Sequence, residues 1–529
     1  MQTINEKAYR QRWTALAFIC LALLAVSFNE TTINVALPSI AKDMQASSSD
    51  LMWVVNAYII VFASLLLPMG SSGDRYGRKL FLVIGLALLS ITSALACYSG
   101  SIEALIAMRG LMGIASAMIM PSTLSILSAT FTDKKERSQA IAIWAATLGL
   151  GAVGTVLGGW VLENFSSTSV FFVNVPLAII AIIGGYFFIS NSKDEHAPSI
   201  DLPGVALSII GMVALAFGII NAGEIGWSDP VVIKSLGSAI VFLAAFCYWE
   251  SRTKNPMLPL SLFKNRSFSL STMAIVIDVF TLAGVSFFFP QFIQTVLGYS
   301  AFQSGLAILP LSAVVVICST LSAKLVGRWG VKKVIVCALM SSTIGLLFMI
   351  ATFGVDTSYL VLLISLIFMG MGSGILTAPA TDSAMSTVPI SKAGVGSATN
   401  NAVISLGGAL GVAVLGSVMN SNYISELHKY ADLHLLPLDV YNTIKSGVVG
   451  AHQFAAYITH PQLQSQFIIY VNQAFVSGMK SALLVDAALV FLTAIAIYRL
   501  LPDMSQMAKK DGEDSIRREV VTPQQSGTQ

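Results

Sequence analysis

The feature of this sequence that most constrains its fold is a series of apolar runs, each long enough to cross a bilayer. A hydrocarbon core about 30 Å thick needs about 20 helical residues, and the backbone must satisfy its hydrogen bonds within each segment. We therefore expect an all-α polytopic membrane protein with 14 transmembrane helices, at 14–37, 51–69, 80–99, 104–129, 138–160, 168–190, 204–222, 231–249, 269–297, 302–326, 331–353, 357–381, 396–420 and 480–501.

The composition agrees with a chain whose main solvent is lipid. Only 11% of the 529 residues are charged, whereas soluble proteins have about 25%. The net charge of +3 gives no reason to expect a nucleic-acid partner. The five Cys lie singly in apolar runs, without metal or redox spacing, so we expect no metal site and no cofactor.

The basic residues test the helix count, because short cytoplasmic loops are enriched in Lys and Arg. If the N-terminus lies inside the cell, 24 of the 30 Lys and Arg residues fall in inner segments and five in outer ones, with Arg109 inside a span. Dropping one helix would invert every later loop and remove this bias. We therefore expect an even number of spans and two cytoplasmic termini, residues 1–13 and 502–529.

An internal repeat suggests how the spans are grouped. The loop after the second span reads GDRYGRK from Gly73, and the loop after the tenth reads GRWGVKK from Gly327. Arg75 and Arg328 are 253 residues apart, which is eight spans rather than six. We expect a six-helix half at 14–190, an inserted helix pair at 204–249 and a second six-helix half at 269–501, the latter containing a long external loop at 421–478. Paired halves around a central site are typical of transporters.

The first of these loops also carries a motif. GSSGDRYGRK, from Gly70 to Lys79, resembles the major facilitator signature G-x-x-x-D-R-x-G-R-[RK] at every defined position. The resemblance implies a cytoplasmic latch that stabilises one conformer, formed by Gly70, Asp74, Arg75, Gly77, Arg78 and Lys79. The alternative is that these charges only fix the membrane orientation.

Two further segments resemble the same superfamily. Arg109 begins an R-x-x-x-G pattern in the fourth span, and the matching Arg of the family is linked to proton coupling; the alternative is a structural ion pair. The fifth span resembles the antiporter signature G-x-x-x-G-P-x-x-G-G, with Thr155 in place of Pro. Its glycine face comprises Gly151, Gly154, Gly158 and Gly159, and the alternative is ordinary packing of small residues.

The end of the first span narrows the resemblance. Phe28 to Pro38 is similar to L-D-x-T-[IV]-V-N-V-A-L-P of the fourteen-helix drug:H+ antiporter family (QacA/EmrB-like multidrug exporters). Asn29 stands at the usual Asp position and Glu30 follows it. One residue is about 100° around a helix, so the acid faces a different direction from that in the family. We expect Asn29, Asn34, Asn56 and Asn401 to supply polar groups to a cavity.

Acids within apolar runs are the candidates for proton coupling and for binding a substrate cation. A lone carboxyl in lipid is costly unless it is protonated or faces a cavity. We rank Glu30 and Asp278 first, Asp382 next and Asp486 last, because Asp486 is expected near the external surface at the end of the fourteenth span.

These features predict a proton-driven exporter of lipophilic, cationic drugs or toxic compounds, acting by alternating access as a monomer in the bacterial plasma membrane. The proton gradient would be its energy source, since the Walker pattern is absent from the sequence. A dedicated exporter of one metabolite, such as a siderophore, amino acid or peptide, is the alternative on the same fold. A membrane-embedded enzyme is a remote third, because the spans show no paired nucleophile and base.

Overall fold

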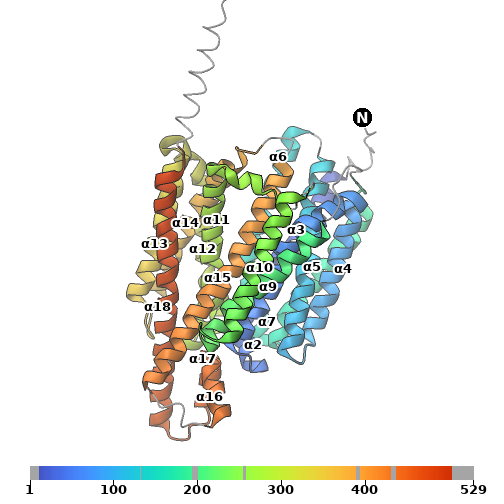
Figure 1. Cartoon of the computed structure of the whole chain (residues 1–529). Helices are drawn as coiled ribbons and strands as arrows, with labels where there is room; N and C mark the ends of the chain where they lie inside the picture. The colour runs from blue at the N-terminus through green and yellow to red at the C-terminus, as the bar shows by residue number, and fades with distance from the viewer. Residues whose placement is uncertain are drawn as a thin grey trace, which may run out of the picture.

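The chain is known from a computed structural model that describes residues 11–131, 133–193, 201–253, 256, 258–388, 393–430 and 437–502. Most of the expected N-terminal segment 1–13 and of the tail 502–529 lies outside these residues. Every regular element in the described part is helical, and the elements form one bundle (Figure 1).

The helices have the following bounds: α2 (Arg12–Met44), α3 (Ser48–Tyr76), α4 (Arg78–Cys97), α5 (Ile102–Thr130), α6 (Lys134–Gly149), η1 (Leu150–Ala152), α7 (Val153–Asn164), η2 (Ser167–Val173), α8 (Asn174–Phe188), α9 (Leu202–Ile225), α10 (Pro230–Arg252), η3 (Leu260–Lys264), α11 (Arg266–Gln291), η4 (Phe292–Val296), α12 (Ala301–Trp329), α13 (Val331–Thr352), α14 (Tyr359–Met385), α15 (Ala393–Tyr430), α16 (Leu438–Lys445), α17 (Val448–Ala455) and α18 (Pro461–Leu500).

Thirteen helices in the described residues are long and apolar enough to cross a membrane. The one expected span that is not among them, the fifth at 138–160, is interrupted: α6 has 16 residues and α7 has 12, and the short turn η1 separates them. The break falls at Gly149-Leu150-Gly151, where glycines weaken a helix because they gain the most freedom on leaving it. Neither piece is long enough to span alone, so the two together make up the expected fifth span.

The helices pack as two groups of six with the same pattern of neighbours. In the first group α2 packs on α5, α7 and α8, α3 packs on α5, and α4 packs on α5 and α8. In the second group α11 packs on α14, α15 and α18, α12 packs on α14, and α13 packs on α14 and α18. Figure 1 shows α4 and α5 on one flank of the bundle and α13 and α18 on the other. The division of the chain into halves at 14–190 and 269–501 stays a prediction.

The two basic turns repeat each other in detail. Gly77 and Gly330 both have positive φ, 128° and 80°, which suits glycine because it lacks a Cβ. Two residues after each glycine, at the second position of the next helix, a lysine lies over a tyrosine ring of the last helix of its group. Lys79 Nζ is 5.2 Å from the centroid of Tyr186, and Lys332 Nζ is 5.6 Å from that of Tyr498.

The inserted pair lies across the front of this arrangement. Helix α9 packs against α3 of the first group and α15 of the second, and α10 packs on α9. Asn420 Nδ2 donates to the carbonyl of Gly223, and Ser49 Oγ donates to Glu224, at 3.2 and 2.7 Å. Helix α10 keeps large apolar side chains exposed, Ile240 by 70% and Val241 by 65%, which fits a face toward lipid.

The segment 421–478, expected to be a long external loop, is largely helical. Helix α15 continues to Tyr430 and α18 begins at Pro461, so two transmembrane helices extend past one end of the bundle, with α16 and α17 beside them (Figure 1). The apolar stretch at Phe467–Tyr470 continues the helix, and Phe454 packs edge-on against Phe467. We call this end the outer end, and the end with the two basic turns the inner end.

Candidate functional site

A buried arginine organises the interior of the first group. Arg109 on α5 is 1% exposed. Its Nε donates to the carbonyl of Val54 on α3 at 2.9 Å, and its Nη1 donates to the carbonyl and the Oδ1 of Asn29 on α2 at 3.3 and 3.2 Å. Its guanidinium carbon lies 4.4 Å from the ring centroid of Tyr58. These bonds run from α5 to acceptors on α2 and α3, so one guanidinium joins the three helices.

Glu30 reaches the same cluster through Tyr58. The Tyr58 hydroxyl donates to Glu30 Oε1 at 3.1 Å, so one tyrosine carries the arginine on its ring and the carboxylate on its hydroxyl. Phe28 and Asn29 beside it are buried, yet Glu30 is exposed. Because α2 is flanked by α5, α7 and α8 of one group and by α11 and α12 of the other, this exposed side chain faces space inside the bundle.

The displacement of the acid by one residue therefore has a structural explanation. Asn29 occupies the place next to Arg109 and gives it two acceptors, while Glu30, turned about 100° away, meets it through Tyr58. Sequence reasoning missed Tyr58. The available signal was its position two residues after Asn56, which the sequence predicts to face a cavity.

The predicted cavity asparagines fall into different surroundings. Asn174 Nδ2 donates to Asn29 Oδ1 at 3.3 Å, which extends the cluster to α8. Asn56 is fully buried, and both polar atoms of its amide lack a partner among the described residues. Asn34 is half-buried, and Asn401 on α15 is exposed. A buried amide without partners is costly, so Asn56 is available to bind water or a ligand.

The second group has its own acid. Asp278 on α11 is 5% exposed and accepts a hydrogen bond from Ser373 Oγ of α14 at 2.7 Å. Helix α11 is the counterpart of α2 in the pattern of contacts, so Asp278 and Glu30 lie on equivalent helices of the two groups. Asp382 is not part of this site, because it is exposed in the last turn of α14.

The interpretation of Asp486 as a near-surface residue is wrong. Helix α18 starts at Pro461, about five turns earlier than the expected span, so Asp486 lies in the middle of the helix. It is 0% exposed, and its Oδ1 accepts from Thr281 of α11 at 2.7 Å.

The glycine face of the fifth span permits close helix contacts. A Cβ on Gly151, Gly154 or Gly158 would approach Ser27, Thr31 or Thr32 of α2. A Cβ on Gly159 would lie 2.6 Å from the carbonyl oxygen of Ala301, where α12 begins. Thr155, which replaces the family's Pro, has its carbonyl against Gly305 of α12. The face thus joins α7 to its own group on one side and to the other group at the outer end.

The residues of the expected latch contact only the first group. Arg78 pairs with Asp74 at 2.6 Å and donates to the carbonyl of Ser125 at 3.4 Å, and Lys79 donates to the carbonyl of Tyr186 at 2.7 Å. Gly77 adopts the positive φ that the turn requires, and Gly70 packs on Pro121. Arg75 is exposed over the ring of Tyr76. In the described residues, none of these bonds crosses to α11–α18.

The outer end, in contrast, is held shut across the two groups. Gln294 Nε2 donates to the carbonyl of Val35 at 2.9 Å, Ser48 N to the carbonyl of Ser446 at 2.6 Å, and Gln453 Nε2 to the carbonyl of Lys42 at 2.7 Å. Each bond joins the first group to η4 or to α16 and α17.

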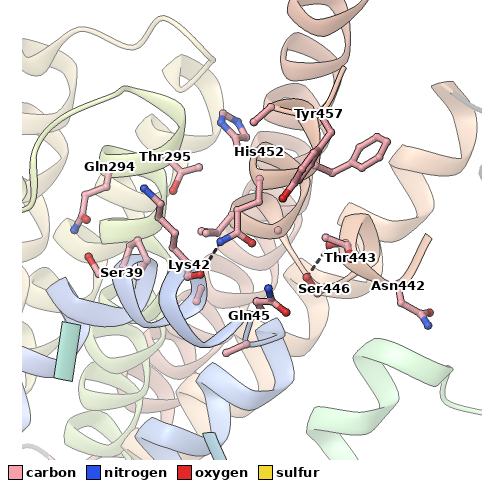
Figure 2. A pocket seen from close by; sticks show the side chains of 18 of the residues that line it. Ser39, Lys42, Gln45, Gln294, Thr295, Asn442, Thr443, Ser446, His452 and Tyr457 are labelled. Carbon is pink, nitrogen blue, oxygen red and sulfur yellow. Dashed lines mark hydrogen bonds between the residues drawn. The ribbon is translucent and has the colours of Figure 1, made fainter. Parts of the chain in front are cut away.

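A cavity of about 1110 Å³ lies at this end, between the end of α2, η4 and the α16–α17 pair (Figure 2). Lys42 and His452 line it and no carboxylate does, among the residues that the structure describes. Burial lowers the pKa of His452, whose Nε2 lies 2.7 Å from Asn472 Oδ1. The cavity is therefore neutral to basic, unlike the interior around Glu30.

Comparison with protein families gives one match. The model of the Major Facilitator Superfamily matches residues 19–412.

Several curated proteins are similar over nearly the full length. The multidrug efflux pump LfrA of Mycolicibacterium smegmatis is 32% identical, over 92% of this chain and 95% of that protein. The tetracenomycin C resistance and export protein of Streptomyces glaucescens is 29% identical, over 94% of both. The methyl viologen resistance protein SmvA of Salmonella typhimurium is 27% identical, over 92% and 98%.

Solved structures share the fold at low sequence identity. A bacterial homologue of the human lysosomal transporter Spinster, inward-facing and unoccupied, has a TM-score of 0.62 at 17% identity, over 92% of this chain and 98% of that one. A D-xylose–proton symporter has a TM-score of 0.55 at 13% identity, over 93% and 98%.

Proposed function

The chain belongs to the major facilitator superfamily, and we propose that it exports lipophilic, cationic drugs or toxic compounds in exchange for protons. It is a multi-pass membrane protein, and the names of its relatives support drug efflux. We place it in the bacterial plasma membrane with both termini in the cytoplasm, working as a monomer, with halves at 14–190 and 269–501 around the pair at 204–249. The inner end is then the cytoplasmic end.

The observation that carries the proposal is the cluster of Glu30, Tyr58 and Arg109. Arg109 supplies one fixed positive charge inside the bundle, and Glu30 offsets it only when it is ionised. An ionised Glu30 facing the interior also offers a carboxylate to a cationic substrate. When Glu30 takes a proton, the cluster carries a net positive charge and repels that cation. One carboxyl thus makes proton binding and cation binding exclusive of each other.

Alternating access follows from where the halves are joined. With the outer end closed and Glu30 ionised, a cation enters from the inner end and lies against the carboxylate. The halves then rock, and the outer bonds at Val35, Lys42 and Ser48 break. A proton from the outer water binds a Glu30 oxygen, and the cation leaves past Lys42 and His452, which do not retain it. Returning to the first state releases the proton inside.

The membrane potential assists any cycle that carries net charge inward, by about 2.3 kcal/mol per charge at 100 mV. In this scheme the proton gradient is the energy source.

The test is transport into everted membrane vesicles, using a fluorescent cationic dye and an imposed proton gradient. We expect gradient-driven dye uptake that falls at least about tenfold in Glu30→Gln. Absence of gradient-driven uptake in the wild-type protein, or normal uptake in both Glu30→Gln and Asp278→Asn, contradicts the proposal.

A dedicated exporter of one compound remains a second candidate, because some relatives are named for a single antibiotic, such as tetracenomycin C or methylenomycin A. Susceptibility profiling of a deletion strain against quaternary ammonium compounds, dyes and metabolites separates the two. A broad profile supports multidrug efflux, and a change confined to one compound supports the dedicated exporter.

A further inference from the structure

Two acids of the second half, one on α11 and one on α18, are buried inside the bundle. Asp278 on α11 is 5% exposed and Asp486 on α18 is 0% exposed. Each carboxyl accepts one hydrogen bond from a neutral hydroxyl, Ser373 Oγ to Asp278 Oδ2 and Thr281 Oγ1 to Asp486 Oδ1, both at 2.7 Å. The Oδ2 of Asp486 is buried and has no partner.

The two carboxyls share one face of α11. Thr281 follows Asp278 by three residues, which places the two side chains on the same side of the helix, about one turn apart. Since the Thr281 hydroxyl reaches Asp486, the Asp486 carboxyl points at α11 beside Asp278.

No cation compensates this pair. Among the described residues, no other charged side chain contacts either carboxyl. The charged side chains on the elements packed around the pair lie at element ends or on other faces: Arg266 on α11, Lys264 on η3, Asp382 on α14, Lys332 and Lys333 on α13, Glu426, His428 and Lys429 on α15, His452 on α17, Lys480 and Arg499 on α18, and Arg12, Glu30, Lys42 and Asp43 on α2.

Two uncompensated carboxyls in such surroundings cannot both ionise, because desolvation and mutual repulsion both favour the neutral form. Two neutral hydroxyls are too few to stabilise two anions with four oxygens, and one oxygen has no donor at all. Asp278 is 5% exposed, whereas Asp486 is 0% exposed.

We propose that Asp278 and Asp486 form a second proton-binding site, in the half that lacks Glu30, and that this site exchanges its proton during the transport cycle. This proposal rests on the proposed proton-coupled export. The protein then carries one proton site in each half, on the equivalent helices α2 and α11. Export of a monovalent cation exchanges more than one proton and moves net charge across the membrane.

Infrared difference spectroscopy of purified, substrate-free protein tests proton binding without any transport. Protonated carboxyls give a C=O stretching band apart from that of carboxylates. We expect the spectrum at neutral pH to lose one such band in Asp486→Asn, and to be unchanged in Asp356→Asn, which replaces an exposed loop acid. If Asp486→Asn does not fold, Thr281→Val should shift the same band by removing its hydrogen bond. If no variant at this pair loses or shifts such a band, the proposal is overturned.

Reconstituted vesicles test proton exchange. We expect wild-type export of a monovalent dye to respond to membrane potential at zero pH gradient. In Asp486→Asn we expect the export rate driven by membrane potential to fall at least about fivefold, while export driven by a pH gradient is kept. If wild-type export responds to the pH gradient but not to the membrane potential, the proposal that this site exchanges its proton during transport is overturned. If no gradient drives export, the proposed function fails, and the infrared result still decides whether the pair holds a proton.

Discussion

A guanidinium inside a membrane protein has to find acceptors within the bundle, and Arg109 finds them on two neighbouring helices. Its three oxygen acceptors come from Val54 and Asn29, and the flat face of its guanidinium lies on Tyr58. Most of this compensation comes from dipoles and a ring rather than from a carboxylate. The single nearby acid, Glu30, is therefore free to change its charge without unlocking the arginine.

We predict that Arg109→Lys lowers the initial rate of dye export at least about tenfold. A lysine ammonium cannot reach Val54 and Asn29 in a planar fork, so α2 and α3 lose their common anchor. The free energy of unfolding should fall by about 1–3 kcal/mol, the usual cost of leaving buried partners unsatisfied. Export rates and thermal unfolding of purified protein measure both effects.

Arg252→Lys is the matched control, since Arg252 is exposed and also lies over a tyrosine, 5.5 Å from the centroid of Tyr248. It should leave both quantities unchanged. Wild-type export by Arg109→Lys would show that the forked contacts of Arg109 are dispensable.

His452 gives a prediction for pH. Burial lowers its pKa from the ordinary value of about 6.5, so the folded protein binds this proton less readily than the unfolded chain does. The stabilisation is complete above pH ~6.5 and is lost as the pH falls below it. Amide hydrogen exchange in α16 and α17 should therefore accelerate from pH ~7.5 to pH ~5.5, beyond the intrinsic effect of pH.

In His452→Gln this acceleration should disappear, because glutamine does not titrate. His460→Gln, at an exposed position, should retain it. Equal acceleration in wild type and His452→Gln would mean that another group senses the pH.

Sequence reasoning singled out Glu30, Arg109 and Asp278 as candidates because a charge inside an apolar run is visible without a structure. Tyr58 was invisible to it, since a tyrosine in a span is usually ordinary packing and only the contacts on both sides of its ring reveal its role. Asp486 was misjudged because hydropathy ends the last span where polar residues begin, whereas α18 continues through them to Pro461.

Among the helices, the broken fifth span shows what sequence patterns omit. The apolar run and its glycines were both visible, but whether glycines bend, pack or break a helix depends on the neighbours. Here α2 and α12 approach closely enough that Gly154 and Gly159 accommodate them, and the chain turns at η1. The helical extensions at the outer end were missed for a related reason, because they pack on protein rather than lipid and need not be apolar.

We predict that Gly159→Ala separates α7 from α12 at the outer end. Its Cβ would lie 2.6 and 2.7 Å from backbone atoms of Ala301 and Phe302, which cannot turn aside as a side chain can. Overpacking of this kind costs about 1–3 kcal/mol. Here it would destabilise the conformer that is closed at the outer end. Spin labels at Asn164 and Gln303 should show a longer distance, and export should fall about fivefold or more.

Gly237→Ala on α10 is the control, because nothing lies within 4 Å of its Cβ position. It should change neither the distance nor the export rate. An unchanged distance in Gly159→Ala would mean that α7 and α12 can yield without parting.

In the whole molecule, the distribution of contacts between the halves shows that this conformer is closed at the outer end. Hydrogen bonds and glycine contacts join the halves at the outer end, while the latch turn at Gly77 bonds only within its own half in the described residues. The repeat of the basic turn was visible in the sequence, and the even count of spans stays a prediction from the distribution of lysine and arginine. The closed outer end could not be predicted from the sequence. The contacts that close it, such as Gln294 to the carbonyl of Val35, join backbone groups and uncharged side chains, which leave no pattern in the sequence.

If the outer end must open in each cycle, a covalent bond across it should stop transport. Ser48 N donates to the carbonyl of Ser446 at 2.6 Å, so the two residues lie close enough for a disulfide to be tried there. In a chain lacking its five native cysteines, we expect oxidised Ser48→Cys/Ser446→Cys to lose at least about nine-tenths of its export, and reductant to restore it. Mass spectrometry measures the extent of cross-linking in the same sample.

The control places a cross-link within one half. Thr168 Oγ1 donates to the carbonyl of Cys97 at 2.8 Å, and both residues belong to the first group. Thr168→Cys with Cys97 retained should cross-link and still export, because those parts move together when the halves rock. Full export by a completely cross-linked Ser48/Ser446 pair would instead mean that substrate leaves without parting α3 from α16. The exit would then lie elsewhere than through the cavity lined by Lys42 and His452.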